Sequence, residues 1–133
     1  MTDRPLPAID ADTKPYWEAA REGRLLVQRC DECGAHQFPP RRRCVRCGGA
    51  VSWVAASGRG TVYAFTVVHR AAHEAFADLV PYVVALIDLA EGVRLMTRLQ
   101  GAAPDAVRIG LPASVAFEKV TDDVTLPYFT VSA

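Results

Sequence analysis

Hydrophobic and polar positions alternate in short blocks over the second half of the chain. Valine, threonine and aromatic residues dominate the hydrophobic blocks, and this composition is typical of β-strands. Glycine, proline and acidic residues fill the gaps between blocks, and Glu91-Gly92 has the character of a hairpin turn. The pattern predicts strands at 52–57, 60–70, 82–89, 93–100, 114–121 and 127–131.

The amino-terminal pattern is helical instead. Asp12 or Thr13 can cap a short helix that ends before Gly23. Tyr16 and Trp17 then lie on one face of this helix. Because a helix of about ten residues is marginal alone, we expect these aromatic rings to pack either on the core of this chain or on another subunit.

Four cysteines form two C-x-x-C pairs, and each pair is followed by a glycine, as in CDECG and CVRCG. The cysteines are Cys30, Cys33, Cys44 and Cys47. Two such pairs can place four thiolates about 2.3 Å from one tetrahedral Zn²⁺ ion. Since all four ligand positions are filled by cysteine, we expect a structural rather than a catalytic metal. Two disulfides, a redox pair or an iron site are the alternatives.

The chain is therefore predicted to be mainly β, in three parts. Residues 1–23 form a helical arm, residues 24–52 a four-cysteine zinc ribbon, and residues 53–133 a barrel. A strand at 24–29 leads into the first cysteine pair, and Phe38-Pro39-Pro40 forms an extended turn between the pairs. Roughly five strands in about 75 residues favour an OB-fold barrel over a sandwich of seven or more strands.

Length and charge restrict the function. A chain of 133 residues is too short for a dinucleotide-binding enzyme or an α/β barrel. Fifteen basic residues balance fifteen acidic ones, which argues against a typical nucleic-acid-binding domain. The balance is uneven along the chain, because residues 24–60 carry seven arginines and only two carboxylates. This segment is a basic patch built from the side chain best suited to phosphate and carboxylate contacts.

The first twenty residues contain acids and prolines but no apolar run of seven residues or more. We therefore expect neither a signal peptide nor a transit peptide, and a cytoplasmic protein.

The order of these motifs resembles a known family over nearly the whole chain. The matching segments are PYWEAAREGRL, CDECG, FPPR, CVRCG, SGRGTVYAFTVVHR, PYVVALIDLAEGVRL, IGLPASVAF and LPYF. They are similar to the proteins that combine a rubredoxin-like zinc ribbon with an OB-fold and associate with acyl-CoA, known as domain-of-unknown-function family 35. Val45 departs from the family, which often has proline after the third cysteine.

The resemblance implies an accessory subunit that is not catalytic alone. Family members are partners of thiolase-superfamily enzymes, including acyltransferases and the aldolases that shorten steroid side chains as CoA thioesters; others associate with hydratases. It therefore implies a hetero-oligomer with a thiolase-like catalytic subunit in lipid or steroid degradation. A bare structural adaptor that never contacts CoA is the alternative within this class.

Two sets of residues are candidates for these contacts. The cluster Arg41, Arg42, Arg43 and Arg46 can hold the phosphates of CoA by charge-assisted hydrogen bonds. Alternatively, these arginines offset the negative charge of a four-thiolate metal centre and otherwise face solvent. Tyr16, Trp17 and Phe38 are the candidates for the partner interface, because aromatic side chains often dominate such contacts.

Other chemistry has weaker support in the sequence. His69-Arg70 followed by His73-Glu74 is the one constellation with acid–base character, and a loop near a partner subunit is its simpler interpretation. Asp122-Asp123 is interpreted as an acidic turn.

The rival class is a module that binds single-stranded nucleic acid. It would stack bases on aromatic residues such as Tyr63, Phe65 and Tyr82. The acidic barrel segment and the presence of only two lysines argue against this class.

Overall fold

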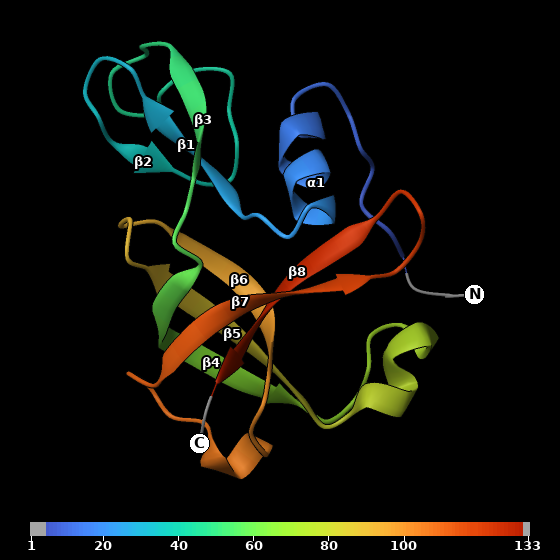
Figure 1. Ribbon diagram of the computed structural model, residues 1–133. Helices are drawn as coiled ribbons and strands as arrows, with labels where there is room; N and C mark the ends of the chain where they lie inside the picture. Colours follow the sequence, from blue (N-terminus) through green and yellow to red (C-terminus); the bar gives the residue numbers. More distant parts are fainter. Residues whose placement is uncertain (1–4, 132–133) are drawn as a thin grey trace.

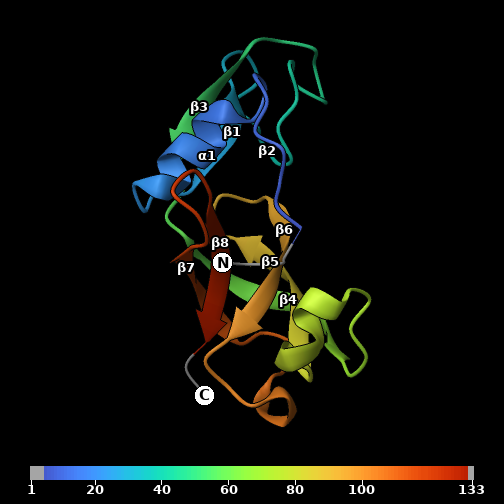
Figure 2. The ribbon, with the colours of Figure 1, turned by 90° about the vertical axis from the view of Figure 1, so that its right-hand side faces the viewer.

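The ribbon lies above the barrel, and the α-helix found within the described residues lies beside the junction between them (Figure 1). The computed structural model describes residues 5–131. Residues 1–4 of the predicted arm and 132–133 of the predicted barrel therefore lie outside the described residues. A view turned by 90° keeps the same order, with ribbon and helix above the barrel (Figure 2). The predicted mainly β fold is confirmed.

The helix α1 spans Lys14–Arg21. Its start is closed by a reciprocal contact, because Asp10 Oδ1 accepts from the Thr13 backbone N–H at 2.9 Å and Thr13 Oγ1 accepts from the Asp10 N–H at 3.2 Å. Gly23 follows the helix with a positive φ of 76°, a conformation that favours glycine. The predicted helix and its end are thus confirmed. Thr13 is the N-cap residue, but its side chain does not cap the helix as predicted, and Asp12 does not occupy the cap position.

The ribbon is a three-stranded sheet in the order β2-β1-β3. Its strands are β1 (Leu26–Cys30), β2 (His36–Gln37) and β3 (Val51–Ala55). β1 begins two residues later than the sequence pattern predicts. The two-residue β2 was not predicted, because it has no hydrophobic alternation; its pairing with β1 holds it in place.

Five strands close the barrel in the order β4-β5-β6-β8-β7. They are β4 (Arg59–Val68), β5 (Tyr82–Leu89), β6 (Arg94–Gln100), β7 (Pro112–Lys119) and β8 (Thr125–Val131). All neighbours are antiparallel except β6 and β8, whose parallel ladder contains only two residue pairs. This closed five-stranded arrangement confirms the predicted OB-fold.

Two short 3₁₀ helices interrupt the barrel connections, η1 (Glu74–Leu79) and η2 (Pro104–Ala106). The sequence places His73 and Glu74 in a loop, whereas Glu74 is the first residue of η1. The predicted turn at Glu91-Gly92 is confirmed, since Gly92 has a φ of 90° and donates its N–H to the Leu89 carbonyl at 2.9 Å.

Ribbon and barrel share one hydrophobic core. Its most deeply buried members include Val62, Ile87 and Phe129 from the barrel, and Val27 from β1 joins the same cluster. Because a ribbon residue with no exposed surface belongs to the same cluster as the barrel residues, the two parts pack directly against each other. Within residues 5–131, no helix is long and apolar enough to cross a membrane.

Candidate metal centre and its surroundings

The two cysteine pairs adopt the same backbone turn. The Cys30 N–H donates to the Ala35 carbonyl and the Gly34 N–H donates to the Cys30 carbonyl. The second pair repeats both bonds, because the Cys44 N–H donates to the Gly49 carbonyl and the Gly48 N–H donates to the Cys44 carbonyl. Both turns therefore present two thiols each toward a common point.

Gly34 and Gly48 complete this equivalence, because each has a φ of 76°. An L-residue rarely adopts that conformation. The glycine that follows each pair is thus required by the turn itself, as the sequence pattern indicated.

The four sulfur atoms form one cluster in which all lie within 4.8 Å of one another. Cys30 Sγ lies 3.5 Å from Cys47 Sγ, and Cys33 Sγ lies 3.6 Å from Cys44 Sγ. Cys30 and Cys44 are buried, whereas Cys33 and Cys47 face the surface. All four are free thiols, so the disulfide alternative is not what the structure shows.

Backbone N–H groups stabilise thiolates at two of the four positions. The N–H groups of Cys33 and Glu32 donate to Cys30 Sγ at 3.3 and 3.4 Å and lower the pKa of that thiol. The N–H groups of Cys47 and Arg46 likewise lower the pKa of Cys44 to about 6. These two sulfurs are prepared to act as anionic ligands.

The pKa of the Cys47 thiol is raised rather than lowered. The Gly49 N–H lowers its pKa, but the three neighbouring sulfurs and partial burial outweigh that effect and raise the pKa to about 12. Four sulfurs this close cannot all carry negative charge unless a cation lies between them. The donor set therefore fits a thiolate-binding divalent metal, which removes this repulsion.

A buried pair of glutamines fixes the loop that carries the second cysteine pair. Gln28 and Gln37 occupy paired positions on β1 and β2 and are 5% and 7% exposed. Gln37 Nε2 donates to Gln28 Oε1 at 2.8 Å and to the Arg43 carbonyl at 3.2 Å. The Arg41 N–H donates to Gln28 Oε1, and the Val45 N–H donates to Gln37 Oε1. Neither residue is predicted from the sequence as a functional residue. Gln28 carries a signal, because it is a polar residue within the hydrophobic strand β1, whereas Gln37 carries none.

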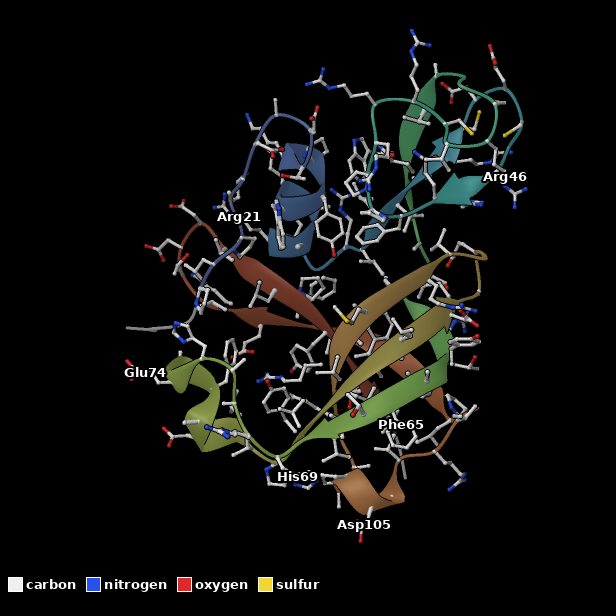
Figure 3. All side chains as sticks on the ribbon, turned by 180° about the vertical axis from the view of Figure 1, so that it is seen from behind. Arg21, Arg46, Phe65, His69, Glu74 and Asp105 are labelled. Carbon is white, nitrogen blue, oxygen red and sulfur yellow. The ribbon has the colours of Figure 1, made fainter. Side chains whose placement is uncertain are left out.

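The predicted arginine cluster lies on this loop and faces solvent. Arg41 and Arg43 donate to the carbonyl groups of Pro40 and Gly48, at 2.9 and 3.2 Å. Arg42 Nε lies 3.4 Å from Asp12 Oδ1. Arg46 lies at the ribbon end of the molecule, beside the cysteine sulfurs (Figure 3). All four arginines are thus exposed on the ribbon, and Arg46 is the one that lies beside the cysteine sulfurs.

The three candidate interface residues lie at the junction of helix, ribbon and barrel. The ring centroid of Tyr16 lies 4.9 Å from that of Trp17 and 5.4 Å from that of Phe38. Tyr16 and Phe38 also pack against the shared core, and burial raises the pKa of the Tyr16 hydroxyl. Of the two packing alternatives for the helix, the structure therefore shows Tyr16 on the core of this chain.

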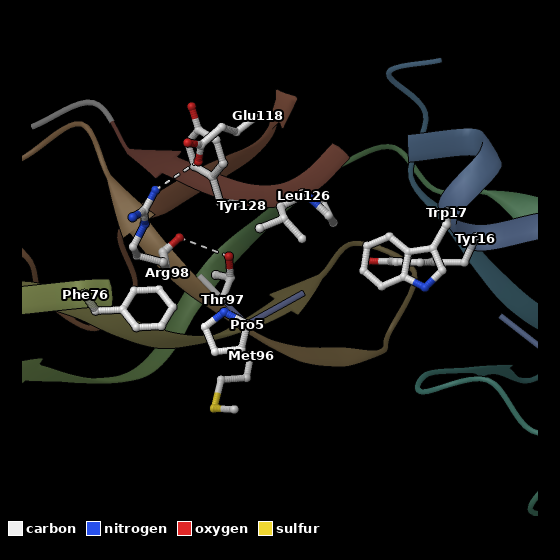
Figure 4. Close-up of a pocket in the computed structure, with 11 residues that line it drawn as sticks. Pro5, Tyr16, Trp17, Phe76, Met96, Thr97, Arg98, Glu118, Leu126 and Tyr128 are labelled. Atoms are coloured by element: carbon white, nitrogen blue, oxygen red, sulfur yellow. Dashed lines mark hydrogen bonds and ion pairs between the residues drawn. The ribbon is translucent and has the colours of Figure 1, made fainter. Parts of the chain in front are cut away.

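A groove of about 320 Å³ lies on the outside of the barrel between α1 and η1 (Figure 4). Trp17 lines one end, and Phe76 lines the other. Between them, the guanidinium of Arg98 pairs with the Glu118 carboxylate at 3.3 Å. The sequence analysis did not identify this groove, because its residues come from strands that only the closed barrel brings together.

The histidine constellation is not assembled as an acid–base pair. His73 Nδ1 accepts from the Ala75 backbone N–H at 3.0 Å and thereby caps η1. His69 and Glu74 lie at the far end of the barrel from Arg46 (Figure 3). Asp122 pairs with Lys119 at 3.6 Å, and Asp123 donates its N–H to Thr121 Oγ1, as expected of a turn.

Comparison with known protein families gives two matches. Residues 17–52 match the ChsH2 rubredoxin-like zinc ribbon domain, and residues 53–118 match the ChsH2 C-terminal OB-fold domain.

Individual proteins are similar over most of the chain. A probable enoyl-CoA hydratase alpha subunit of Thermomonospora curvata is 44% identical over 128 residues, which cover 95% of this chain and 39% of that protein. A DUF35 domain-containing scaffold protein of Methanocaldococcus jannaschii is 34% identical over 110 residues, covering 80% and 77%. The solved Ltp2-ChsH2(DUF35) aldolase superposes with a TM-score of 0.84 at 42% identity, covering 95% of this chain and 98% of the matched one. The chain thus spans well under half of the hydratase subunit but most of the other two.

Proposed function

Because this chain belongs to the ChsH2 family of zinc-ribbon and OB-fold proteins, also called DUF35, we propose that it is a non-catalytic accessory subunit of a thiolase-like enzyme. In this role it binds the catalytic subunit in the cytoplasm and supports its action on acyl-CoA thioesters. The steroid or lipid pathway expected from the resemblance belongs to the same proposal.

One observation carries the proposal. Over 95% of its length and at 42% identity, this chain matches a chain of an aldolase named for two proteins, Ltp2 and ChsH2. The relatives named as a hydratase alpha subunit and as a scaffold protein also support an accessory role beside a separate catalytic subunit. Within residues 5–131, the cysteines form one cluster and His73 caps η1. Each of these side chains therefore has a structural role.

We assign zinc to the four-cysteine site. Cys30, Cys33, Cys44 and Cys47 would hold it, and the ion would supply positive charge that joins the two turns without an open position for substrate. Gln28 and Gln37 then orient the second turn relative to the first. Zinc in this place contributes to folding rather than to bond making.

The contact with CoA is assigned to the arginine loop. Arg41 and Arg43 have exposed side chains that make only single bonds to backbone carbonyls within the described chain. The pair between Arg42 and Asp12 is highly exposed and therefore weak. These guanidinium groups can exchange such contacts for phosphate oxygens at little cost.

The nucleic-acid alternative gains no support from its candidate stacking residues. Tyr63 is covered by the Arg94 guanidinium, 3.4 Å from its ring centroid, and Phe65 packs against the core. Tyr82 has its ring centroid 6.4 Å from that of Phe76. All three rings already have partners within the chain.

The test is purification of the full chain, tagged, from its own cells, followed by identification of what remains bound. We expect a thiolase-like catalytic subunit in a defined ratio, whose turnover of an acyl-CoA falls when the chain is removed. A chain that is isolated alone as a stable monomer would contradict the proposal.

A further inference from the structure

The strand β5 is hydrophobic on both of its faces. Its inward residues, Val83, Ala85, Ile87 and Leu89, are at most 4% exposed. The outward positions between them are also apolar until Asp88, and they are only half-buried. An antiparallel strand with one face in water normally alternates between hydrophobic and polar residues, whereas a strand covered on both faces does not. The sequence of β5 is therefore that of a strand whose outer face is covered.

The strand register extends this feature over three strands. Leu86 pairs with Ala64 on β4 and with Met96 on β6, so these three side chains lie on the same outer face. Met96 is 71% exposed, and Tyr63, beside a bulge in β4, is 47% exposed. We call the surface formed by Tyr63, Ala64, Val84, Leu86 and Met96 the outer face.

Both arginines that border the outer face are neutralised within the chain. The Arg94 guanidinium donates to both carboxylate oxygens of Asp88, at 2.6 and 3.2 Å, and stacks on the Tyr63 ring. Arg98 pairs with Glu118 at 3.3 Å. A partner that covers the outer face therefore needs no counter-charge for these arginines, and an anionic ligand would have to displace a carboxylate first.

The outer face continues into the groove beside α1. Met96 and Arg98 border both surfaces, and the far end of the groove is lined by Trp17 (Figure 4). Trp17 is one of the residues that the sequence analysis assigned to a partner interface. The groove and the outer face thus join into one largely apolar surface, and the two arginines on it, Arg94 and Arg98, are each paired with a carboxylate.

We propose that the outer face docks the catalytic subunit, through an apolar and uncharged patch of that subunit, with Met96 near the centre of the contact. This inference rests on the proposed function. It adds the position of the interface and the chemistry of the partner's patch. Charge pairing within the chain favours this occupant over a nucleic acid or a nucleotide, both of which need free cations.

The test compares substitutions at two positions of the full chain whose side chains are exposed to a similar degree. Met96→Glu places a charge in the outer face, and Ile109→Glu places one at a position that is 69% exposed. Ile109 lies in the turn that precedes β7 and is not one of the residues that define the outer face. The probe is the thiolase-like subunit recovered with the wild-type chain, and the readout is its dissociation constant.

We expect Met96→Glu to raise the dissociation constant by about tenfold or more, with Ile109→Glu within about twofold of wild type. Equal binding by the two variants would overturn the docking face while leaving the proposed function intact. Failure of the wild-type chain to bind any thiolase-like subunit would overturn both. A wild-type homodimer that Met96→Glu dissociates would show that a second copy covers the face and would also overturn the proposal.

A second measurement uses the methionine itself. Met96 and Met1 are the two methionines of the chain, so peroxide oxidation can be followed at Met96 by mass spectrometry. In the isolated chain, we expect rapid oxidation of this exposed side chain. In the assembly, we expect the rate to fall at least about fivefold, in line with burial. An unchanged rate would place Met96 outside the interface.

Discussion

Gln28 and Gln37 are joined by a 2.8 Å hydrogen bond between their side-chain amides, inside the ribbon and on paired positions of β1 and β2. Gln28 Oε1 and both polar atoms of the Gln37 amide also bind the backbone of the loop between Arg41 and Val45. This contact connects the sheet to the second cysteine pair. The position of two metal ligands therefore depends on two buried uncharged side chains.

The first prediction concerns this pair. Gln37→Glu keeps the shape of the side chain but replaces the Nε2 donor with an oxygen that faces the Gln28 and Arg43 oxygens. We expect a loss of about 2 kcal/mol in the free energy of unfolding, since buried polar groups lose their partners. Denaturant unfolding of the metal-loaded chain measures it. The control Ser52→Ala removes an exposed 2.7 Å bond to Asp31 and should cost less than about 1 kcal/mol.

Metal removal is the second prediction. Chelation should unfold the ribbon, because the metal joins the two cysteine turns. The barrel should keep its β structure, because most residues of the shared core come from the barrel itself. Cys44→Ser should weaken metal retention, and cobalt substitution of the wild-type chain should give the absorption of a tetrahedral thiolate site. A chain that keeps the same ribbon structure after complete metal removal would contradict the structural role.

The third prediction concerns alkaline pH. Burial raises the pKa of the Tyr16 hydroxyl above its usual value of 10.0. Above that pH the unfolded chain releases the proton and the folded chain retains it, so the free energy of unfolding falls as pH rises. Tyr16→Phe removes this titration. We expect the variant to lose less stability than wild type between pH 8 and pH 11, and equal losses would show that the hydroxyl is not buried in solution.

The fourth prediction concerns Gly60, where β4 pairs closely with β5. A Cβ atom at Gly60 would collide with the Asp88 carbonyl oxygen and lie 2.8 Å from Ile87 Cγ2. Gly60→Ala should therefore destabilise the barrel by about 1–3 kcal/mol. Gly92→Ala is the control, because its Cβ would meet open space and cost only the strain of a φ of 90°. Thermal unfolding should rank Gly60→Ala as the more harmful change.

The arginine loop supplies the fifth prediction. The triple variant Arg41→Ala, Arg42→Ala, Arg43→Ala should weaken the affinity of the assembly for CoA, measured by thermal stabilisation with the catalytic subunit present. The control replaces three exposed arginines elsewhere, Arg24, Arg70 and Arg108. If the triple variant keeps full affinity, these arginines serve only to balance the metal centre.

Much of this fold could be predicted from local sequence. The barrel strands follow from runs of β-branched and aromatic residues, and β5 has the predicted bounds of Tyr82–Leu89. The metal centre follows from the spacing of four cysteines, because a C-x-x-C-G turn determines its own backbone bonds. In both cases, the decisive interactions lie within a few residues of one another.

The remaining features depend on contacts between distant segments. β2 pairs with β1, where Gln37 lies opposite Gln28, and the segment around Gln37 has no local signal for a strand. The groove combines Trp17, Phe76 and Arg98 from three elements that only the closed barrel brings together. Sequence periodicity indicates which face of a strand is buried, but it does not indicate which distant segment packs against that face.

The most direct test of the central claim is reconstitution with the purified catalytic subunit and an acyl-CoA substrate. We expect no turnover by the chain alone, and an increase in kcat/KM when the wild-type chain is added to the catalytic subunit. The increase should saturate at a fixed ratio of the two proteins. Turnover by the chain alone that His69→Ala abolishes would contradict the account, because the catalytic groups would then lie in this chain.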